Sequence, residues 1–88
     1  MELVLLKQAR EDWDYWLSTN NEKVIKRIKE LIKDINEHPF SGKGKPEPLK
    51  GRLQGKWSRR ITKEHRIVYS ISDGRIYIFV FSLRFHYI

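Results

Sequence analysis

Apolar residues repeat with two different periods along this 88-residue chain, and the change of period divides it into a helical part and a strand part. From residue 22 to residue 37, apolar side chains recur at every third or fourth position with charged residues between them, which predicts an amphipathic helix. Residues 8–17 have the same spacing and predict another helix before it. The polar residues 18–21 separate the two helices and supply side chains that can cap the second one.

Strand patterns lie before and after the helices. Residues 2–6 form a short, nearly continuous apolar run that predicts a strand, and residues 40–50, with their glycines and prolines, predict an irregular loop. Three later segments are rich in aromatic and β-branched residues and predict strands: residues 56–62, 66–71 and 75–83. This order predicts an α+β fold, in which one N-terminal strand and two helices precede an antiparallel β-meander. We expect the helices on one side of the sheet and a single domain of residues 1–88.

The positive charge of the chain is concentrated in one segment. The formal net charge is +7, and residues 43–66 alone carry nine Lys or Arg against two acidic residues, whereas residues 1–42 carry seven against eight. This basic segment also contains Trp57. A basic surface beside an aromatic side chain indicates an anionic partner, of which nucleic acid is the first candidate and a membrane surface the second.

Several function classes are excluded by what the sequence lacks. There is no cysteine, which rules out disulfides, thiolate metal sites and cysteine nucleophiles. The longest wholly apolar run, residues 76–81, is far too short to span a bilayer, and the N-terminus does not have the pattern of a secretory signal. We therefore expect a cytoplasmic protein with no membrane partner. The three histidines are 27 and 21 residues apart, which fits no helical metal motif, so we predict no metal site and no cofactor.

Three isolated groups have the chemistry that metal-free RNA cleavage requires. The reaction needs a base for the ribose 2′-hydroxyl, an acid for the leaving 5′-oxygen and a fixed cation beside the phosphorus. Glu47, His86 and Arg66 are of the right types. The residues alone leave other interpretations open, because Glu47 could be an ion-pair partner within its loop and His86 a residue of a frayed tail.

Three motifs resemble the Txe/YoeB family of toxin–antitoxin toxins, within the RelE-like superfamily. They read GKGKPEPLKG at 42–51, WSRRITKEHRIVY at 57–69 and RFHY at 84–87, and the likeness extends over both predicted helices. The resemblance implies a microbial-ribonuclease-like fold and cleavage of mRNA in the ribosomal A site during translation. It also implies neutralisation by a cognate antitoxin, which the charge of +7 predicts to be acidic. The resemblance is also compatible with two assemblies: a toxin dimer, and a toxin–antitoxin heteromer that binds operator DNA.

Carried over residue by residue, the resemblance assigns roles within these motifs. Glu47 matches the general base, Arg66 the arginine that supports the transition state, His86 the general acid and Tyr87 the aromatic that contacts the cleaved nucleotide. The basic residues expected to contact RNA are Lys45, Lys50, Arg59, Arg60 and Arg84. The chain departs from the family pattern at its end, with Phe85 where relatives often have tyrosine and with Ile88 after the usual terminal tyrosine.

Two other function classes fit the same composition. A non-catalytic RNA- or ribosome-binding module would use the basic surface but would need neither Glu47 nor His86. A protein-interaction domain would use that surface only to receive an acidic partner. Loss of cleavage on removal of Glu47 or His86 distinguishes the enzyme from both.

Overall fold

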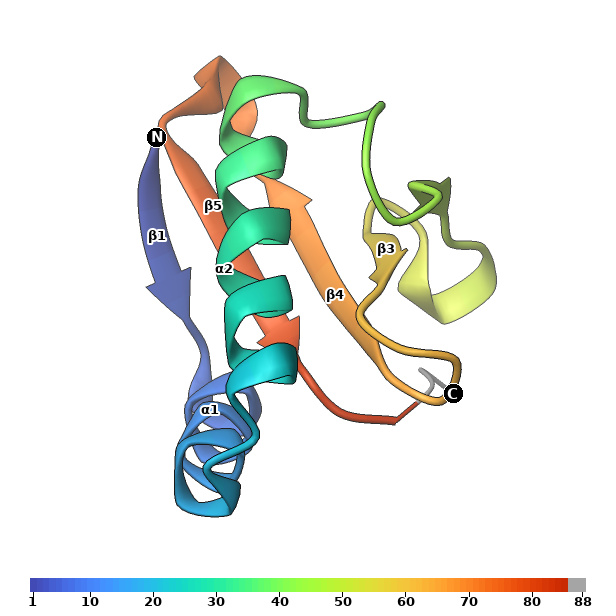
Figure 1. Cartoon of the computed structure of the whole chain (residues 1–88). Helices are drawn as coiled ribbons and strands as arrows, with labels where there is room; N and C mark the ends of the chain where they lie inside the picture. The colour runs from blue at the N-terminus through green and yellow to red at the C-terminus, as the bar shows by residue number, and fades with distance from the viewer. Residues whose placement is uncertain (86–88) are drawn as a thin grey trace.

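A computed structural model describes residues 1–85, and its elements follow the predicted order, with a short additional strand in the loop (Figure 1). The helices and strands are β1 (Glu2–Leu5), α1 (Lys7–Thr19), α2 (Glu22–Glu37), β2 (Glu47–Pro48), β3 (Trp57–Arg60), β4 (Arg66–Ile71) and β5 (Tyr77–Ser82). Two single-turn 3₁₀ helices, η1 (Gly51–Leu53) and η2 (Asp73–Arg75), lie in the connections. Neither α1 nor α2 is long and apolar enough to cross a membrane.

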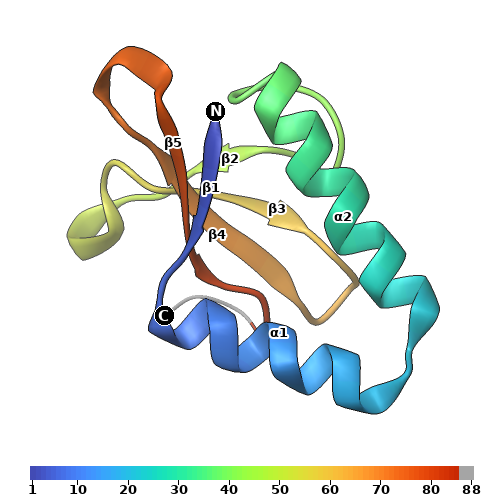
Figure 2. The ribbon, with the colours of Figure 1, turned by 90° about the vertical axis from the view of Figure 1, so that its left-hand side faces the viewer.

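The five strands form one sheet in the order β1-β5-β4-β3-β2. The pairs β2·β3, β3·β4 and β4·β5 are antiparallel, which confirms the predicted meander, whereas β1 pairs in parallel with β5. Figure 2 shows α2 along one face of this sheet and α1 across its lower end. The predicted α+β architecture is therefore confirmed, with one parallel pair at an edge of the sheet.

The two helices are the elements that the apolar spacing predicts best. α2 has the predicted bounds, and the Asn21 side chain caps it by accepting a hydrogen bond from the Val24 N–H at 3.2 Å. Its buried residues are Val24, Ile28, Leu31 and Ile35. α1 runs from Lys7 to Thr19, slightly beyond the predicted segment on both sides.

Alternation along the strands separates a core face of the sheet from an open face. Ile67 and Tyr69 of β4 and Ile78 of β5 belong to the core cluster that includes both helices. Because successive side chains of a strand point to opposite faces, Arg66 and Val68 lie on the face without helices. This helix-free face of the sheet is called the open face below.

Two predicted strands are shorter in the structure because side chains or turns take over their hydrogen bonds. β3 ends at Arg60, since the N–H groups of Ile61 and Thr62 both donate to the His65 carbonyl and close the turn. β5 ends at Ser82, and the next N–H, that of Leu83, donates to the Asp12 carboxylate of α1.

Candidate active site

Glu47 lies on the two-residue strand β2, which the sequence predicted only as loop. It is exposed and pairs with Ser58 of β3. The loop before it is pressed onto the fold at Gly44, whose carbonyl accepts from the Arg60 N–H at 2.7 Å. A Cβ at Gly44 would lie 2.9 Å from a Leu31 methyl group, so this close approach requires glycine. The sequence could not reveal β2, because two residues, one of them proline, carry no strand period.

Arg66 is anchored at one end of its guanidinium group. It is half-buried at the start of β4, and its Nη1 donates to the carbonyls of Thr62, Lys63 and His65 at 3.1 to 3.2 Å. Within residues 1–85, its Nε and Nη2 donate to no protein group. Arg66 therefore combines a fixed position with two N–H groups suited to a phosphate.

The register of the sheet brings Glu47 and Arg66 to the same face. Glu47 is opposite Ser58, which is opposite Val68, and residues directly opposite one another share a face. Arg66 lies two residues from Val68 along β4, again on the open face. Two strand spacings and two residues place the Cα atoms of Glu47 and Arg66 roughly 12 Å apart, a span that their long side chains can bridge around one phosphate.

Two arginines face each other on the open face. Arg60, which is exposed, is the cross-strand partner of Arg66. Like charges directly opposite one another destabilise a strand pair, and an anion between them relieves the repulsion. Lys45 and Lys50 are also exposed, and Lys50 and Glu47 line a hollow of about 510 Å³. This part of the sheet is suited to hold an anion beside a carboxylate.

Residues 83–85, called the C-terminal segment below, are fixed to α1 by buried hydrogen bonds of Leu83. The Asp12 carboxylate, itself only 2% exposed, accepts from the Leu83 N–H at 2.8 Å. The Trp16 indole N–H donates to the Leu83 carbonyl at 2.9 Å. After Leu83, the guanidinium of Arg84 lies 3.6 Å from the ring centre of Tyr15. Arg84 is thus already engaged in a cation–π contact, and its predicted contact with RNA stays a prediction.

Phe85 contacts the start of β4 at Arg66 and the residue before it, His65. Its carbonyl accepts from the Arg66 backbone N–H at 3.1 Å, and its own N–H donates to Nδ1 of His65 at 2.7 Å. Its φ of 57° is a left-handed conformation that costs a bulky residue about 1 to 3 kcal/mol. The predicted catalytic residues His86 and Tyr87 lie outside the described residues.

The prediction that Arg59 contacts RNA is wrong, because its side chain is fully buried on the core face. It donates to the Asp34 carboxylate at 2.5 Å and to the Tyr69 hydroxyl at 3.1 Å. Three carbonyl oxygens of the loop after α2 also accept from it: those of His38, Ser41 and Lys43. Strand alternation could have indicated that Arg59 is buried. Residues two apart in a strand share a face, and Trp57 packs against the core.

This buried network shifts two pKa values in opposite directions. The backbone N–H of Lys43 and the Arg59 guanidinium outweigh desolvation and hold the pKa of Asp34 below its ordinary value of 3.8. Burial raises the pKa of Tyr69 above its ordinary value of 10.0, although Arg59 opposes that shift. The network is therefore complete when Asp34 is ionised and Tyr69 is neutral.

The unfolding free energy of Asp34→Asn should change less than that of the wild type as pH falls from 7 to 3. Because the folded-state pKa of Asp34 is lowered, its carboxylate stabilises the fold above about pH 4 and loses that contribution as pH falls through the folded-state value. The difference in unfolding free energy between wild type and Asp34→Asn should be large near pH 7 and smaller near pH 3 in urea titrations. Glu37→Gln, an exposed carboxylate one turn away, is the control. An equal difference at both pH values would contradict this role.

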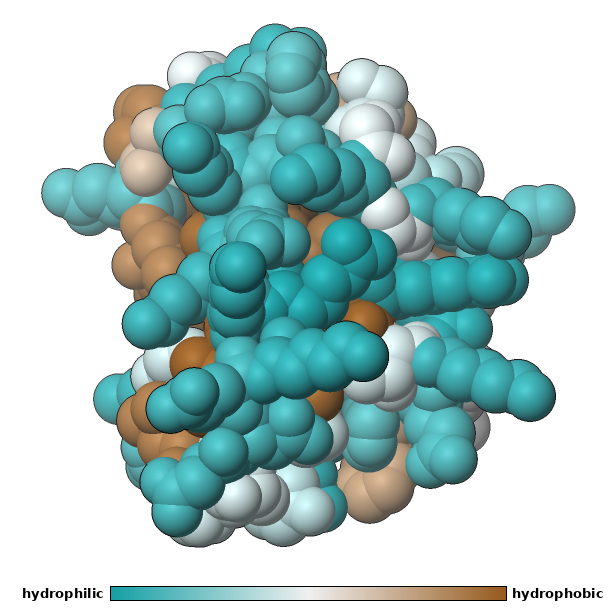
Figure 3. Space-filling model, viewed as in Figure 1, coloured by the Kyte–Doolittle hydropathy of each residue, from teal (hydrophilic) through white to brown (hydrophobic). Residues whose placement is uncertain are grey.

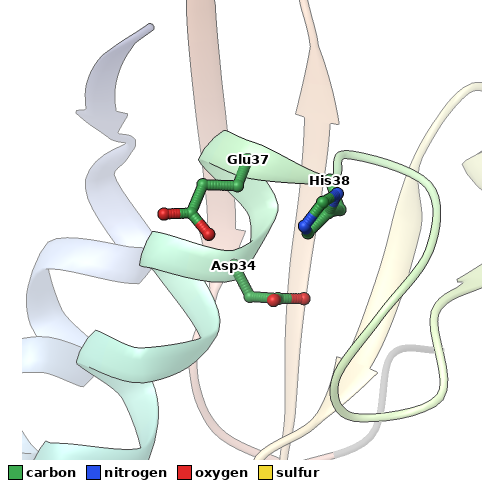
Figure 4. A group of neighbouring side chains, drawn as sticks. All are labelled: Asp34, Glu37 and His38. Carbon is green, nitrogen blue, oxygen red and sulfur yellow. The ribbon is translucent and has the colours of Figure 1, made fainter.

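Asp34 also belongs to a cluster that the histidine spacings did not suggest. Its carboxylate, that of Glu37 and the imidazole of His38 offer ligand atoms within 4.8 Å of one another at the end of α2 (Figure 4). Oxygen and imidazole ligands of this kind fit a zinc-like ion. One oxygen of Asp34, however, already accepts from both Arg59 and the Lys43 N–H. A metal ion would therefore have to share this carboxylate with a buried guanidinium, whose positive charge opposes it.

The helix face of the molecule differs from the open face. Figure 3 shows this face covered mainly by hydrophilic side chains, with small apolar areas between them. A groove of about 590 Å³ lies beside the first half of α2, where Lys23, Lys26 and Arg27 contribute positive charge. Lys26 thus lies on the helix face, whereas Glu47 is on the open face of the sheet, and Lys26 serves below as a control.

Comparisons with known proteins agree on one family. The family model for the YoeB-like toxin of bacterial type II toxin-antitoxin systems matches residues 5–87. The toxin YoeB of Escherichia coli K12 is 48% identical over 99% of this chain and 100% of its own length. The YoeB/ParE toxin structure from Agrobacterium tumefaciens superposes with a TM-score of 0.92 at 42% identity, covering 99% of this chain and 100% of that one.

Two structures of the Staphylococcus aureus relative add its assembly states. One is a YoeB dimer, with a TM-score of 0.87 at 41% identity, and the other is a YoeB–YefM complex, with a TM-score of 0.86 at 42% identity. Each alignment covers 99% of this chain and 98% of the relative. The family match, the identities over the full length and the shared fold lead to one conclusion: this chain belongs to the YoeB-like toxins of bacterial type II toxin–antitoxin systems.

Proposed function

We propose that this toxin is a ribosome-dependent endoribonuclease that cleaves mRNA in the A site by metal-free acid–base chemistry. The observation that carries the proposal is the open face, where the sheet register brings an exposed carboxylate, Glu47, to the same side as the partly anchored guanidinium of Arg66. The C-terminal segment is bonded to the Arg66 backbone at Phe85, one residue before the proposed acid. Membership of the toxin family supports the same reading.

In the proposed reaction, Glu47 takes the proton of a ribose 2′-hydroxyl, and that oxygen attacks the adjacent phosphorus. Arg66 stabilises the charge that develops on the phosphoryl oxygens, with Arg60 opposite it on β3 and with Lys50 beside Glu47. His86 gives a proton to the departing 5′-oxygen, and Tyr87 contacts the cleaved nucleotide. The products are a 2′,3′-cyclic phosphate and a 5′-hydroxyl, so no water enters the bond-breaking step, and in this proposal side chains alone supply the acid and the base.

The experiment that tests this function is cleavage mapping on a defined mRNA with and without translating ribosomes. We expect cuts at A-site codons when ribosomes are present and little cleavage of the same RNA alone, because the ribosome supplies the positioning that lowers the barrier. Uniform cleavage of free RNA would contradict ribosome dependence. Absence of cleavage in both samples, with ribosome binding retained, would favour the RNA-binding module.

Ribosome affinity should fall steeply with salt and should depend on the basic residues near Glu47. Lys50→Glu and Lys45→Glu should each lower the affinity and reduce the slope of log affinity against log salt by roughly one, because each removes a phosphate contact. Lys26→Glu, on the helix face, carries the same charge change and should have a smaller effect. Equal losses from all three variants in a filter-binding titration would contradict this location of the RNA surface.

A cognate acidic antitoxin is the proposed inhibitor, acting in the cytoplasm where translation occurs. The YoeB–YefM complex of the Staphylococcus aureus relative supports this partner, and the dimer of that relative supports toxin self-association as a second state. A segment that binds the positive surface should protect it directly. Hydrogen exchange should therefore slow at residues 43–66 when the antitoxin is added. Protection restricted to α1 and α2 would contradict direct coverage of the basic surface.

A further inference from the structure

We propose that His65 is a positioning residue for the proposed reaction and that it acts by holding the main chain of Phe85, the residue before the proposed acid. The inference rests on the proposed function, but the contact that carries it lies among the described residues. Nδ1 of His65 accepts the Phe85 N–H at 2.7 Å. The next residue of the chain, Arg66, donates its backbone N–H to the carbonyl of the same Phe85 at 3.1 Å. Both polar groups of the Phe85 main chain are thus bonded to β4 and its preceding turn.

The geometry defines the protonation state that this role requires. An imidazole nitrogen that accepts a hydrogen bond from a backbone N–H carries a lone pair, so the ring proton must be on Nε2. A doubly protonated His65 has no acceptor for Phe85. The role is therefore specific to the neutral imidazole, and no apolar ring of the same shape can perform it.

The imidazole is fixed from several sides. Its ring meets the Trp16 ring edge-on, with centroids 4.9 Å apart at 90°, and lies 5.3 Å from the Phe85 ring. Trp16 is in turn bonded to the Leu83 carbonyl. The His65 N–H donates to the Thr62 hydroxyl at 3.1 Å, so the backbone that carries the imidazole is held as well. A chain of contacts from α1 through Trp16 and His65 to Phe85 sets where the last residues begin.

Phe85 needs such support because of its backbone conformation. With φ at 57°, it occupies a left-handed region that bulky residues seldom adopt unless neighbouring interactions impose it. Without the bond to His65, the Arg66 N–H alone would hold the Phe85 main chain. Displacement of a reacting group by about 1 Å can cost about 100-fold in rate, so loss of this bond should slow cleavage without weakening the basic surface that binds RNA.

Two substitutions separate the hydrogen bond from the ring packing. His65→Phe keeps an aromatic ring against Trp16 and removes the acceptor, whereas His65→Asn keeps an acceptor oxygen close to the position of Nδ1 and removes the ring. We expect His65→Phe to speed amide hydrogen exchange at Phe85 and to lower the single-turnover cleavage rate roughly 10- to 100-fold at unchanged ribosome affinity. His65→Asn should recover most of both losses. Glu64→Gln, an exposed neighbour, is the control.

The two readouts make failures distinguishable. If amide hydrogen exchange at Phe85 is unchanged in His65→Phe, the hydrogen bond from Phe85 to His65 does not hold the Phe85 main chain, whatever the cleavage rate. Faster exchange with a wild-type cleavage rate would refute the positioning role, and so would a His65→Asn protein as slow as His65→Phe, because packing alone would then explain the loss. Should His65→Phe fail to fold, exchange and cleavage in His65→Asn against His65→Ala give the same decision. A wild-type protein that never cleaves mRNA would refute the proposed function, while Phe85 exchange would still decide whether His65 holds the Phe85 main chain.

Discussion

Arg59→Met should destabilise the protein by about 3 to 5 kcal/mol, because it removes a fully buried guanidinium with all its hydrogen bonds and leaves the half-buried Asp34 without its ion-pair partner. The Asp34 carboxylate would lose its guanidinium, and the carbonyls of His38 and Ser41 would lose their donors. A domain of this kind has a total stability of about 5 to 15 kcal/mol, so the loss is a large part of the whole. Urea unfolding followed by tryptophan fluorescence measures it.

Arg60→Met is the matched control for that change. Arg60 is the next residue along β3, carries the same side chain and points to the open face, where it is exposed. Its replacement should change the unfolding free energy by less than about 1 kcal/mol, and relief of its repulsion with Arg66 works in the stabilising direction. Similar losses from the two variants would contradict the assignment of Arg59 to the core.

Glu47→Ala and Arg66→Ala should each lower ribosome-dependent cleavage by at least about 100-fold. Glu47→Ala removes the proposed base, and general acid–base groups contribute about 100- to 10,000-fold. Arg66→Ala removes charge stabilisation of similar size. Glu47→Ala should also bind ribosomes as tightly as wild type or more so, since a carboxylate near phosphates opposes binding.

Arg75→Ala is the control for the loss of a positive charge. Arg75 lies in the turn between β4 and β5, where its guanidinium is 5.7 Å from the ring centre of Phe40. It should retain wild-type cleavage in a single-turnover assay. Glu47→Ala or Arg66→Ala proteins that fold normally and cleave at the wild-type rate would exclude these residues from the reaction.

The sequence predicted most reliably those elements whose side chains repeat with a local period. α2 has four buried residues on one face and an asparagine cap, and both features can be read locally. β4 has the predicted bounds for a similar reason, since its six residues include alternating core positions. Long-range pairings have no such signal, and nothing in residues 2–6 indicates that β1 pairs in parallel with β5.

The sequence predicted which residue types form the candidate site, but it did not predict which of the basic residues are exposed and which are buried. The resemblance named Glu47 and Arg66, and the sheet register adds that they share the open face. Arg59 and Arg60 are the same residue type at consecutive positions, but Arg59 lies in the core and Arg60 on the surface. The reason is that successive side chains of a strand point to opposite faces. The contacts of His65 could not be predicted, since they join a turn to a segment 20 residues later.

The most direct test of the proposed mechanism is analysis of the new RNA ends after single-turnover cleavage of a defined message on programmed ribosomes. Attack by the 2′-hydroxyl predicts a 2′,3′-cyclic phosphate or 3′-phosphate on one fragment and a 5′-hydroxyl on the other. The same assay with His86→Ala should show a loss of at least about 100-fold at unchanged ribosome affinity. A 5′-phosphate product, or a wild-type rate from His86→Ala, would contradict metal-free acid–base cleavage.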